Sequence, residues 1–511
     1  MKSVRELAVR ESGRFAGSML AAQAACVLLI PFPRLLAAQQ PPPPSQSPSS
    51  SQQPGAGAQL QTGTASGLSA DARLLNLLAD HRFRAIEAQL SQLPPEQAQF
   101  YRGILANRSN DLEQSIQLLS PLVDAVAQSG NAVYEKLLRK ALAEDYLRLG
   151  EWAKAADAYQ ALVTRLKGKL TADEQDEIEM PLKLLPLAKD NPPATVEPHN
   201  PFKLPVSEDP LGLVDVPVFV DGRSRNWMLD PTLPFNFIAR STAKSAGLKM
   251  TNAGATVGTL TGRPIEVHAT VIPRFTIGGR LTLRNMPAFV YDDKDYYFPR
   301  TSYQVEGVLG YPALAAIGSI TITSDNTIFV RPAKQIAAPE ANDLLTDGAR
   351  FYLDGDQVIV ALGGARSIGG GDPQPGTGAA GLGTGRAAAG PENSASVAGD
   401  ERMFAVDAGG QQTYLTSRYF DEHAAEFNGQ KMEMFSLLGG QSPPTPAYVA
   451  ENVPLQVGTT ALTLHFLHVL TQPLGSDALN DVYGVLGTDA LGQLKSYTFD
   501  YRTMRFAVTV E

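Results

Sequence analysis

The sequence predicts a multidomain α + β protein, in which an N-terminal α-helical repeat domain is followed by two β-rich lobes that form a pseudo-dimer. Apolar residues recur at helical spacing up to residue 169, and after residue 204 they alternate with polar residues as in strands. The string GVLG occurs twice, and each copy begins 77 residues after an aspartate, Asp230 in the first case and Asp407 in the second. Repetition at a fixed spacing indicates a duplicated structural unit.

Residues 1–38 have the pattern of a secretory signal peptide. Basic residues precede an apolar run over 15–30, and the small residues Ala37 and Ala38 follow it. We therefore expect an exported protein, periplasmic or secreted, and an uncleaved membrane anchor is the alternative. The only cysteine, Cys26, lies inside the apolar run, so a cleaved chain could form no disulfide.

The next segments alternate between disorder and helices. Residues 39–68 are rich in Pro, Gln and Ser and predict a disordered linker, because they offer little apolar surface to bury. Residues 69–169 fit three helical hairpins, and the pattern around Trp152 resembles a tetratricopeptide repeat (TPR). An ordinary helical bundle is the alternative. Residues 170–203 are charged and then proline-rich, and they predict a second linker.

The two lobes are expected at 204–335 and 340–511, since short strands separated by turn residues fill both ranges. Residues 363–399 consist mostly of Gly, Ala, Pro and Ser and fall between two apolar strands. We expect a disordered insertion within a hairpin there.

The two halves align at an offset of 177 residues. WMLDPTLPFNFI (227–238) aligns with FAVDAGGQQTYL (404–415), and the segments around the GVLG copies align at the same offset. An aspartate turn followed later by two apolar residues and a glycine resembles the retropepsin-like and pepsin-like aspartic peptidases. The resemblance extends from Val214 to the C-terminus.

The resemblance implies a catalytic pair, Asp230 and Asp407, that shares one proton and activates a water molecule against a peptide carbonyl. It also implies that Gly310 and Gly487 let the backbone pass close behind the aspartates, and that no metal or organic cofactor takes part. The turn residues implied to contact the substrate are Thr232 and Gly409.

Both turns depart from the family pattern of Asp-Thr/Ser-Gly. They read Asp-Pro-Thr at 230–232 and Asp-Ala-Gly at 407–409, so neither has, directly after the aspartate, the hydroxyl group that links the lobes in the family.

Two functions remain open. One is an aspartic-type endopeptidase that hydrolyses peptides in the cleft between the lobes. The other is a catalytically degenerate module that binds polypeptides while the helices recruit a partner. A purely structural role of the helical domain is a third possibility with less support from the sequence.

Charge and motifs exclude other classes of function. The net charge of −9 gives no basic surface for nucleic acid. Neither the GxSxG motif of serine hydrolases nor the phosphate-binding GxxxxGK[ST] loop is present.

Glycines that could lie in mobile flaps over the cleft are Gly254, Gly258, Gly262, Gly439 and Gly440.

Overall fold

The computed structural model describes residues 65–511 with the exception of 231–232, 258–264, 300, 337–344, 346, 356, 365–400, 408–411, 437–443, 474–480 and 511. The predicted signal peptide, nearly all of the first linker and the interior of the predicted insertion lie outside these residues. Among the helices that are described, none is both long and apolar enough to cross a membrane.

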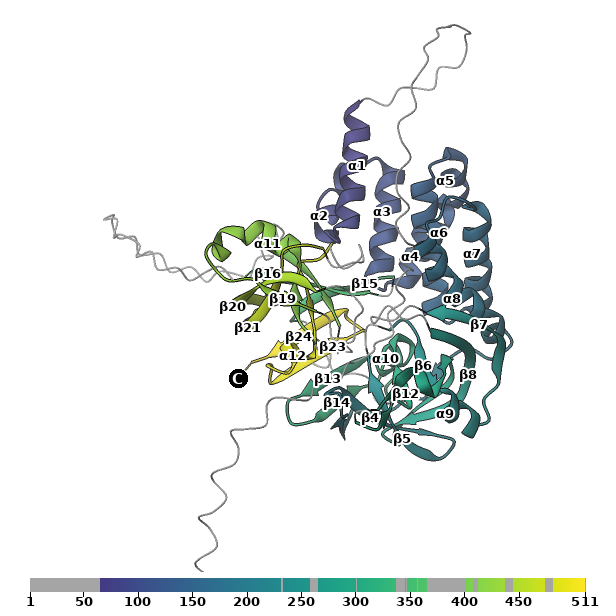
Figure 1. The fold of residues 1–511 in the computed structure, drawn as a ribbon. Coiled ribbons are helices and arrows are strands. Elements are labelled where there is room, and N and C mark those ends of the chain that lie inside the picture. The colour runs from purple at the N-terminus through teal and green to yellow at the C-terminus, as the bar shows by residue number, and fades with distance from the viewer. Residues whose placement is uncertain are drawn as a thin grey trace, which may run out of the picture.

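The N-terminal part is helical and forms the upper layer of the molecule in Figure 1. Some of its helices begin after a capping side chain. Asp111 accepts a hydrogen bond from the amide of Gln114 in α4, and Asn131 accepts from the amides of Val133 and Tyr134 at the start of α6. Its helices are α1 (Ala65–Ala79), α2 (Phe83–Glu87), α3 (Pro95–Arg108), α4 (Leu112–Leu119), α5 (Val123–Ser129), α6 (Ala132–Arg148), α7 (Trp152–Arg165) and α8 (Ala172–Lys189).

Helix α8 corrects the prediction of a linker over 170–203. It contains Pro181 and Pro186, residues that normally end a helix. Ile178, Leu184 and Leu185 are nevertheless buried against α7 and the first lobe. Tertiary packing of this apolar face outweighs the unfavourable prolines.

The first lobe is built on a nine-stranded sheet with the order β1-β9-β6-β12-β5-β4-β8-β7, in which β3 pairs with β4. The short helices α9 (Arg240–Ser245) and α10 (Tyr311–Ile317) follow β6 and β12. The strands are β1 (Thr195–Val196), β3 (Ser207–Glu208), β4 (Val214–Val220), β5 (Arg223–Leu229), β6 (Asn236–Ala239), β7 (Met250–Val257), β8 (Ile265–Ile277), β9 (Leu281–Tyr291) and β12 (Gly307–Leu309).

The second lobe belongs to a thirteen-stranded sheet that also takes strands from the first lobe. The order is β19-β20-β21-β18-β22-β17-β16-β15-β24-β23-β13-β14-β2. Its strands are β2 (Phe202–Pro205), β13 (Ser319–Thr323), β14 (Thr327–Arg331), β15 (Ala349–Asp354), β16 (Gln357–Gly364), β17 (Glu401–Val406), β18 (Tyr414–Leu415), β19 (Glu433–Phe435), β20 (Thr445–Val457), β21 (Thr460–Leu470), β22 (Gly484–Leu486), β23 (Ser496–Asp500) and β24 (Arg505–Thr509). Helices α11 (Ser417–His423) and α12 (Thr488–Leu491) follow β18 and β22.

The predicted fold class is confirmed, since a helical region precedes two β-rich lobes. Strands β16 and β17 pair in antiparallel fashion, with Ile359 opposite Ala405, so the segment between them is inserted in a hairpin as expected. Residues 319–331 form a hairpin of β13 and β14 with a turn at Asn326.

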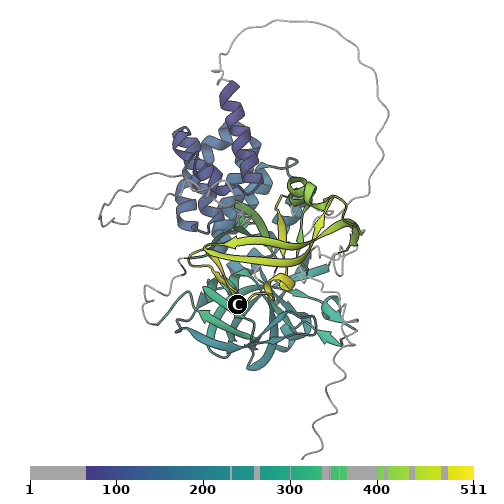
Figure 2. The same cartoon turned by 90° about the vertical axis from the view of Figure 1, so that its left-hand side faces the viewer.

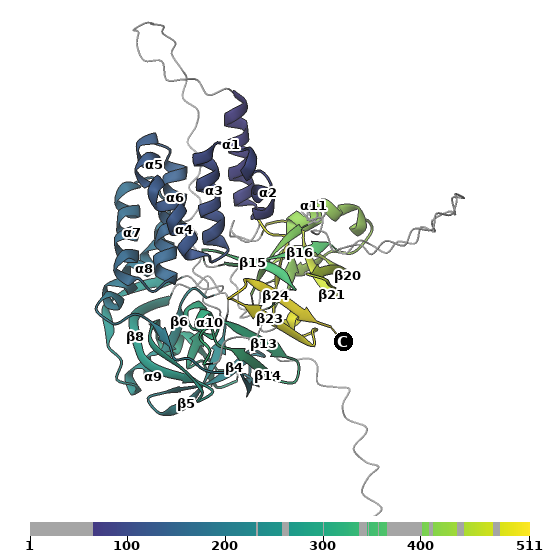
Figure 3. The same cartoon turned by 180° about the vertical axis from the view of Figure 1, so that it is seen from behind.

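The helical part packs on both lobes rather than standing apart from them (Figures 1 and 3). Leu184 of α8 is fully buried in the same apolar cluster as Phe237 and Tyr291 of the first lobe. The ring centres of Phe83 in α2 and Tyr352 in β15 lie 4.5 Å apart. Figures 1 and 3 place the C-terminus at the outer edge of the second lobe, on the side that faces the viewer in Figure 2.

Candidate functional site

Asp230 stands at the end of strand β5, in the interior of the first lobe. Strand β12 runs parallel to β5, with Leu309 opposite Leu229, and the amide of Asp230 donates a hydrogen bond to the carbonyl oxygen of Leu309 (3.1 Å). Only 1% of Asp230 is exposed. The first GVLG copy therefore forms the strand that fixes this aspartate.

Asp407 has the same backbone pairing in the second lobe, although it is half-buried where Asp230 is fully buried. It follows strand β17, which runs parallel to β22 with Val406 opposite Leu486. The amide of Asp407 donates to the carbonyl oxygen of Leu486 (2.8 Å). Each aspartate is thus held by the leucine of its own GVLG copy, as the shared spacing requires.

The glycine that ends each copy lies against the chain that returns from the aspartate turn. A Cβ atom on Gly310 would stand 2.0 Å from the carbonyl oxygen of Phe235, and one on Gly487 would stand 2.7 Å from the carbonyl carbon of Gln412. Both contacts are with backbone, which has little freedom to move. A side chain at either position would displace the loop that carries the aspartate.

Two residues that the sequence analysis did not select support these glycines. The side-chain oxygen of Asn236 accepts from the amide of Gly310 (3.0 Å), and the hydroxyl of Thr413 accepts from the amide of Gly487 (2.8 Å). Asn236 and Thr413 are themselves separated by the 177-residue offset. An alignment of the two halves that looked for hydrogen-bonding residues, and not for aspartates alone, would have found them.

The lobes meet about an approximate twofold axis. Strands β13 and β23 pair in antiparallel fashion with Thr321 opposite Thr498, residues that are again 177 apart, and their hydroxyls lie 2.8 Å from each other. The backbone hydrogen bonds on either side also correspond under this offset. The amide of Tyr501 donates to the carbonyl oxygen of Gly318, and the amide of Ser324 donates to the carbonyl oxygen of Lys495. The two aspartates consequently occupy matching positions about one axis.

Tyrosines lie close to each aspartate and are kept neutral. Burial raises the pKa of Tyr296 and of Tyr501, and the negative charge of Asp230 adds to the rise in both. Burial raises the pKa of Tyr414 in the same way, with Asp407 as the further cause. The aspartates thus lie among buried phenols, an environment of low polarity in which two adjacent carboxyls would share a proton.

The remaining predicted site residues fall outside the described part of the chain. Thr232 and Gly409, together with Pro231 and Ala408, are in the two turns after the aspartates. Of the possible flap glycines only Gly254 is described, and it lies in β7. The structure therefore brings Asp230 together with Gly310 and Asp407 together with Gly487.

A model of the aspartyl protease family matches residues 216–313. This range includes Asp230 and Gly310, and it ends within helix α10. The match is confined to the first lobe. The likeness of the second lobe to the first depends on the internal repeat and on the matching geometry around the two aspartates. None of the curated proteins searched matches the chain.

A solved structure that aligns with part of this chain is that of conglutin gamma, a unique basic 7S globulin from lupine seeds. It is 12% identical in sequence, with a TM-score of 0.36. The alignment covers 62% of this chain and 96% of conglutin gamma.

Proposed function

We propose that the protein is an aspartic-type endopeptidase in which Asp230 and Asp407 form the catalytic pair. The observation that carries the proposal is the equivalence of the two aspartates. Each ends a buried strand, each donates its amide to the leucine of a parallel GVLG strand, and the two lobes pair at Thr321 and Thr498. The match of the first lobe to the aspartyl protease family supports the same conclusion.

The chemistry would use one proton shared between two carboxyls. Like charges at short distance cannot both ionise, so one carboxyl stays protonated while the other is charged. The charged carboxylate takes a proton from a water molecule as that water attacks the peptide carbonyl. The protonated carboxyl donates a hydrogen bond to the carbonyl oxygen, where negative charge develops. No metal or organic cofactor is needed for these steps.

The expected substrate is an extended polypeptide, because strands beside a groove can pair with a peptide backbone. The helical part would control how the peptide reaches the site, since it packs on β7 and β8 of the first lobe through α8. Export by a signal peptide at 1–38 is part of the proposal, and so is recruitment of a further protein by TPR-like helices.

A second function is a binding module that has lost catalysis. The observation that favours it is the absence of Ser or Thr directly after either aspartate, where Pro231 and Ala408 stand instead. Without that hydroxyl the aspartates lose a hydrogen bond that would orient them, and preorganised orientation supplies much of an active site's rate. Such a protein would hold a polypeptide without cleaving it.

The test compares the purified chain with Asp230→Asn and Asp407→Asn in a peptide-library cleavage assay between pH 3 and pH 7. We expect cleavage by the unaltered protein and its loss in both variants, while Asp421→Asn, which changes an exposed aspartate, keeps full activity. Retained cleavage in either of the first two variants would exclude this pair. Saturable binding of peptides without any cleavage would identify the second function.

A further inference from the structure

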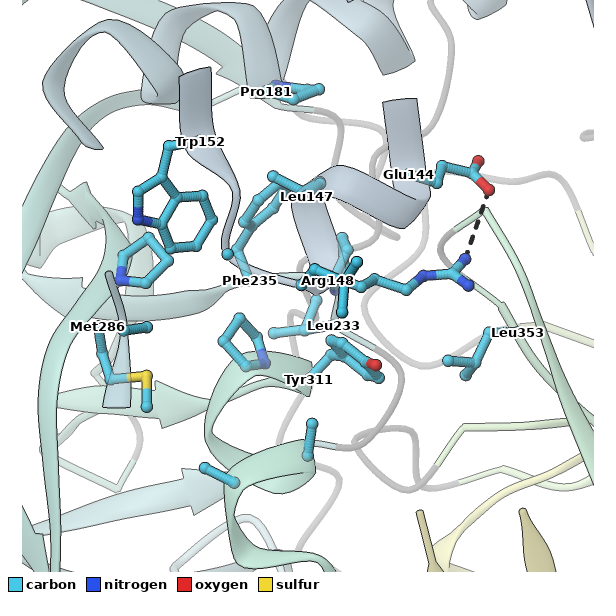
Figure 4. A pocket seen from close by; sticks show the side chains of 18 of the residues that line it. Glu144, Leu147, Arg148, Trp152, Pro181, Leu233, Phe235, Met286, Tyr311 and Leu353 are labelled. Atoms are coloured by element: carbon cyan, nitrogen blue, oxygen red, sulfur yellow. Dashed lines mark hydrogen bonds and ion pairs between the residues drawn. The ribbon is translucent and has the colours of Figure 1, made fainter. Parts of the chain in front are cut away.

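A cavity of about 260 Å³ lies where the helical part meets both lobes (Figure 4). The helical part contributes Leu147 and Trp152, the first lobe contributes Phe235 and Met286, and the second lobe contributes Leu353. Three parts of the chain that are distant in sequence therefore line one cavity, which is partly open to solvent.

The wall of the cavity is mostly carbon. Aromatic rings, aliphatic side chains and prolines predominate, and the side chains drawn in Figure 4 show few polar atoms around the space. A cavity with walls of this kind holds water poorly, because a water molecule needs two to four polar partners.

Several polar groups of the wall are already paired. Arg148 donates to the carbonyl oxygen of Asn107 (2.9 Å) and forms an ion pair with Glu144 (3.4 Å). The hydroxyl of Tyr311 donates to the side chain of Asn110 (2.8 Å). A neutral ligand would leave these interactions intact.

The volume limits the size of a ligand. Apolar cavities of about 150 Å³ bind a benzene ring. A space of 260 Å³ accommodates two fused rings or an alkyl chain of similar volume. Long lipids and peptides of several residues are too large to be enclosed.

We propose that this cavity is a binding site for a neutral, apolar small molecule of the size of two fused rings. The site does not depend on peptidase activity. A molecule bound there would contact all three parts of the chain, and it would stabilise the docking of the helical part on the lobes. It would also touch Leu233 and Phe235, which lie on the loop that leaves Asp230.

The first experiment titrates the full chain with 1-naphthylamine, a neutral two-ring probe whose fluorescence depends on its surroundings. We expect saturable binding of one probe per chain, with energy transfer from Trp152. The protein has two tryptophans, and of these Trp152 lines the cavity whereas Trp227 does not. Because energy transfer weakens with distance, Trp152→Phe should remove most of the transfer while leaving the probe's own fluorescence titration in place.

The second experiment fills the cavity. Ala315→Phe places a ring in the lining from helix α10, and Ala316→Leu is a smaller change at the neighbouring position. We expect each to weaken binding by about tenfold or more. Ala425→Phe, at an exposed alanine, is the matched control and should bind the probe normally.

Three results would overturn the proposal. One is the absence of saturable binding to the unaltered chain. The others are binding that remains equally tight in Ala316→Leu and binding without energy transfer from Trp152, because in either case the probe would occupy a different surface. Ala316→Leu keeps the test decisive if Ala315→Phe fails to fold.

Discussion

We expect the buried carboxyl of Asp215 to contribute more stability to the first lobe in acid than at neutral pH. Asp215 is the second residue of strand β4 and is 3% exposed. Tyr303 donates a hydrogen bond to one carboxyl oxygen (3.1 Å), and the other oxygen is buried without a hydrogen-bond partner among the described residues. Burial, followed by the charge of Asp209, raises the pKa of Asp215 to about 7.

The direction of the effect follows from proton binding. The folded protein holds this proton more tightly than the unfolded chain, in which the pKa is near the ordinary value of 3.8. The contribution to stability is therefore complete below pH 3.8 and is lost as the pH rises through about 7. A rise of this size corresponds to about 4 kcal/mol between the two limits.

The assay is urea unfolding followed by the fluorescence of Trp227, which lies in the strand next to Asp215. A Trp152→Phe background leaves Trp227 as the only tryptophan. We expect the free energy of unfolding of the first lobe to fall by about 4 kcal/mol from pH 4 to pH 8, and Asp215→Asn should remove most of that fall. Asp421→Asn should leave it unchanged. An Asp215→Asn variant with the same pH dependence as its parent would refute the reasoning.

Three further predictions concern packing and pairing. Gly310→Ala should destabilise the first lobe by about 1–3 kcal/mol and abolish cleavage, since its Cβ meets backbone at 2.0 Å; urea unfolding and the peptide assay measure both. Thr321→Val and Thr498→Val should show a coupling of about 1 kcal/mol in a double-mutant cycle, because each removes the same hydrogen bond. Arg108→Leu should cost about 2–3 kcal/mol, measured by thermal unfolding, because it removes a buried guanidinium that pairs with Asp354 at 2.9 Å and with Glu144 at 3.3 Å.

Each of these predictions has a matched control. Gly363→Ala introduces the same methyl group at a strand glycine where the nearest atom is a side-chain carbon at 3.3 Å, and it should change stability by less than about 0.5 kcal/mol. A coupling of zero between Thr321 and Thr498 would show that their contact contributes nothing. The double variant Arg108→Leu/Asp354→Leu should recover most of the loss, and no recovery would refute the ion-pair explanation.

Much of the fold was accessible from the sequence because local patterns determine it. The short strands expected over 204–335 are present, for example as β4, since alternating apolar residues and a turn at Asp221-Gly222 act within one hairpin. The two aspartate strands and their GVLG partners were found because duplication repeated them at one offset. Helix α8 was missed because its prolines are a local signal against a helix. The burial of Leu184 and Leu185, which stabilises the helix, depends on contacts with residues distant in sequence.

The candidate site was predicted only in part. The aspartates and glycines were found from a motif, but Asn236 and Thr413 act through single hydrogen bonds that have no fixed sequence pattern. The cavity could not be predicted at all. Its walls come from residues as far apart as Trp152 and Leu353, and only the docking of the helices on both lobes brings them together.

The thirteen-stranded sheet has a consequence for how the protein can be made. Strand β13 of the first lobe pairs with β23, which follows it only after the whole of the second lobe up to Lys495, and β24 pairs with β23 in turn. During synthesis the first lobe therefore presents an unpaired strand edge until β23 emerges, and such edges promote aggregation. Maturation of the first lobe must wait for β23, and a chain that stops before Ser496 would carry that exposed edge permanently.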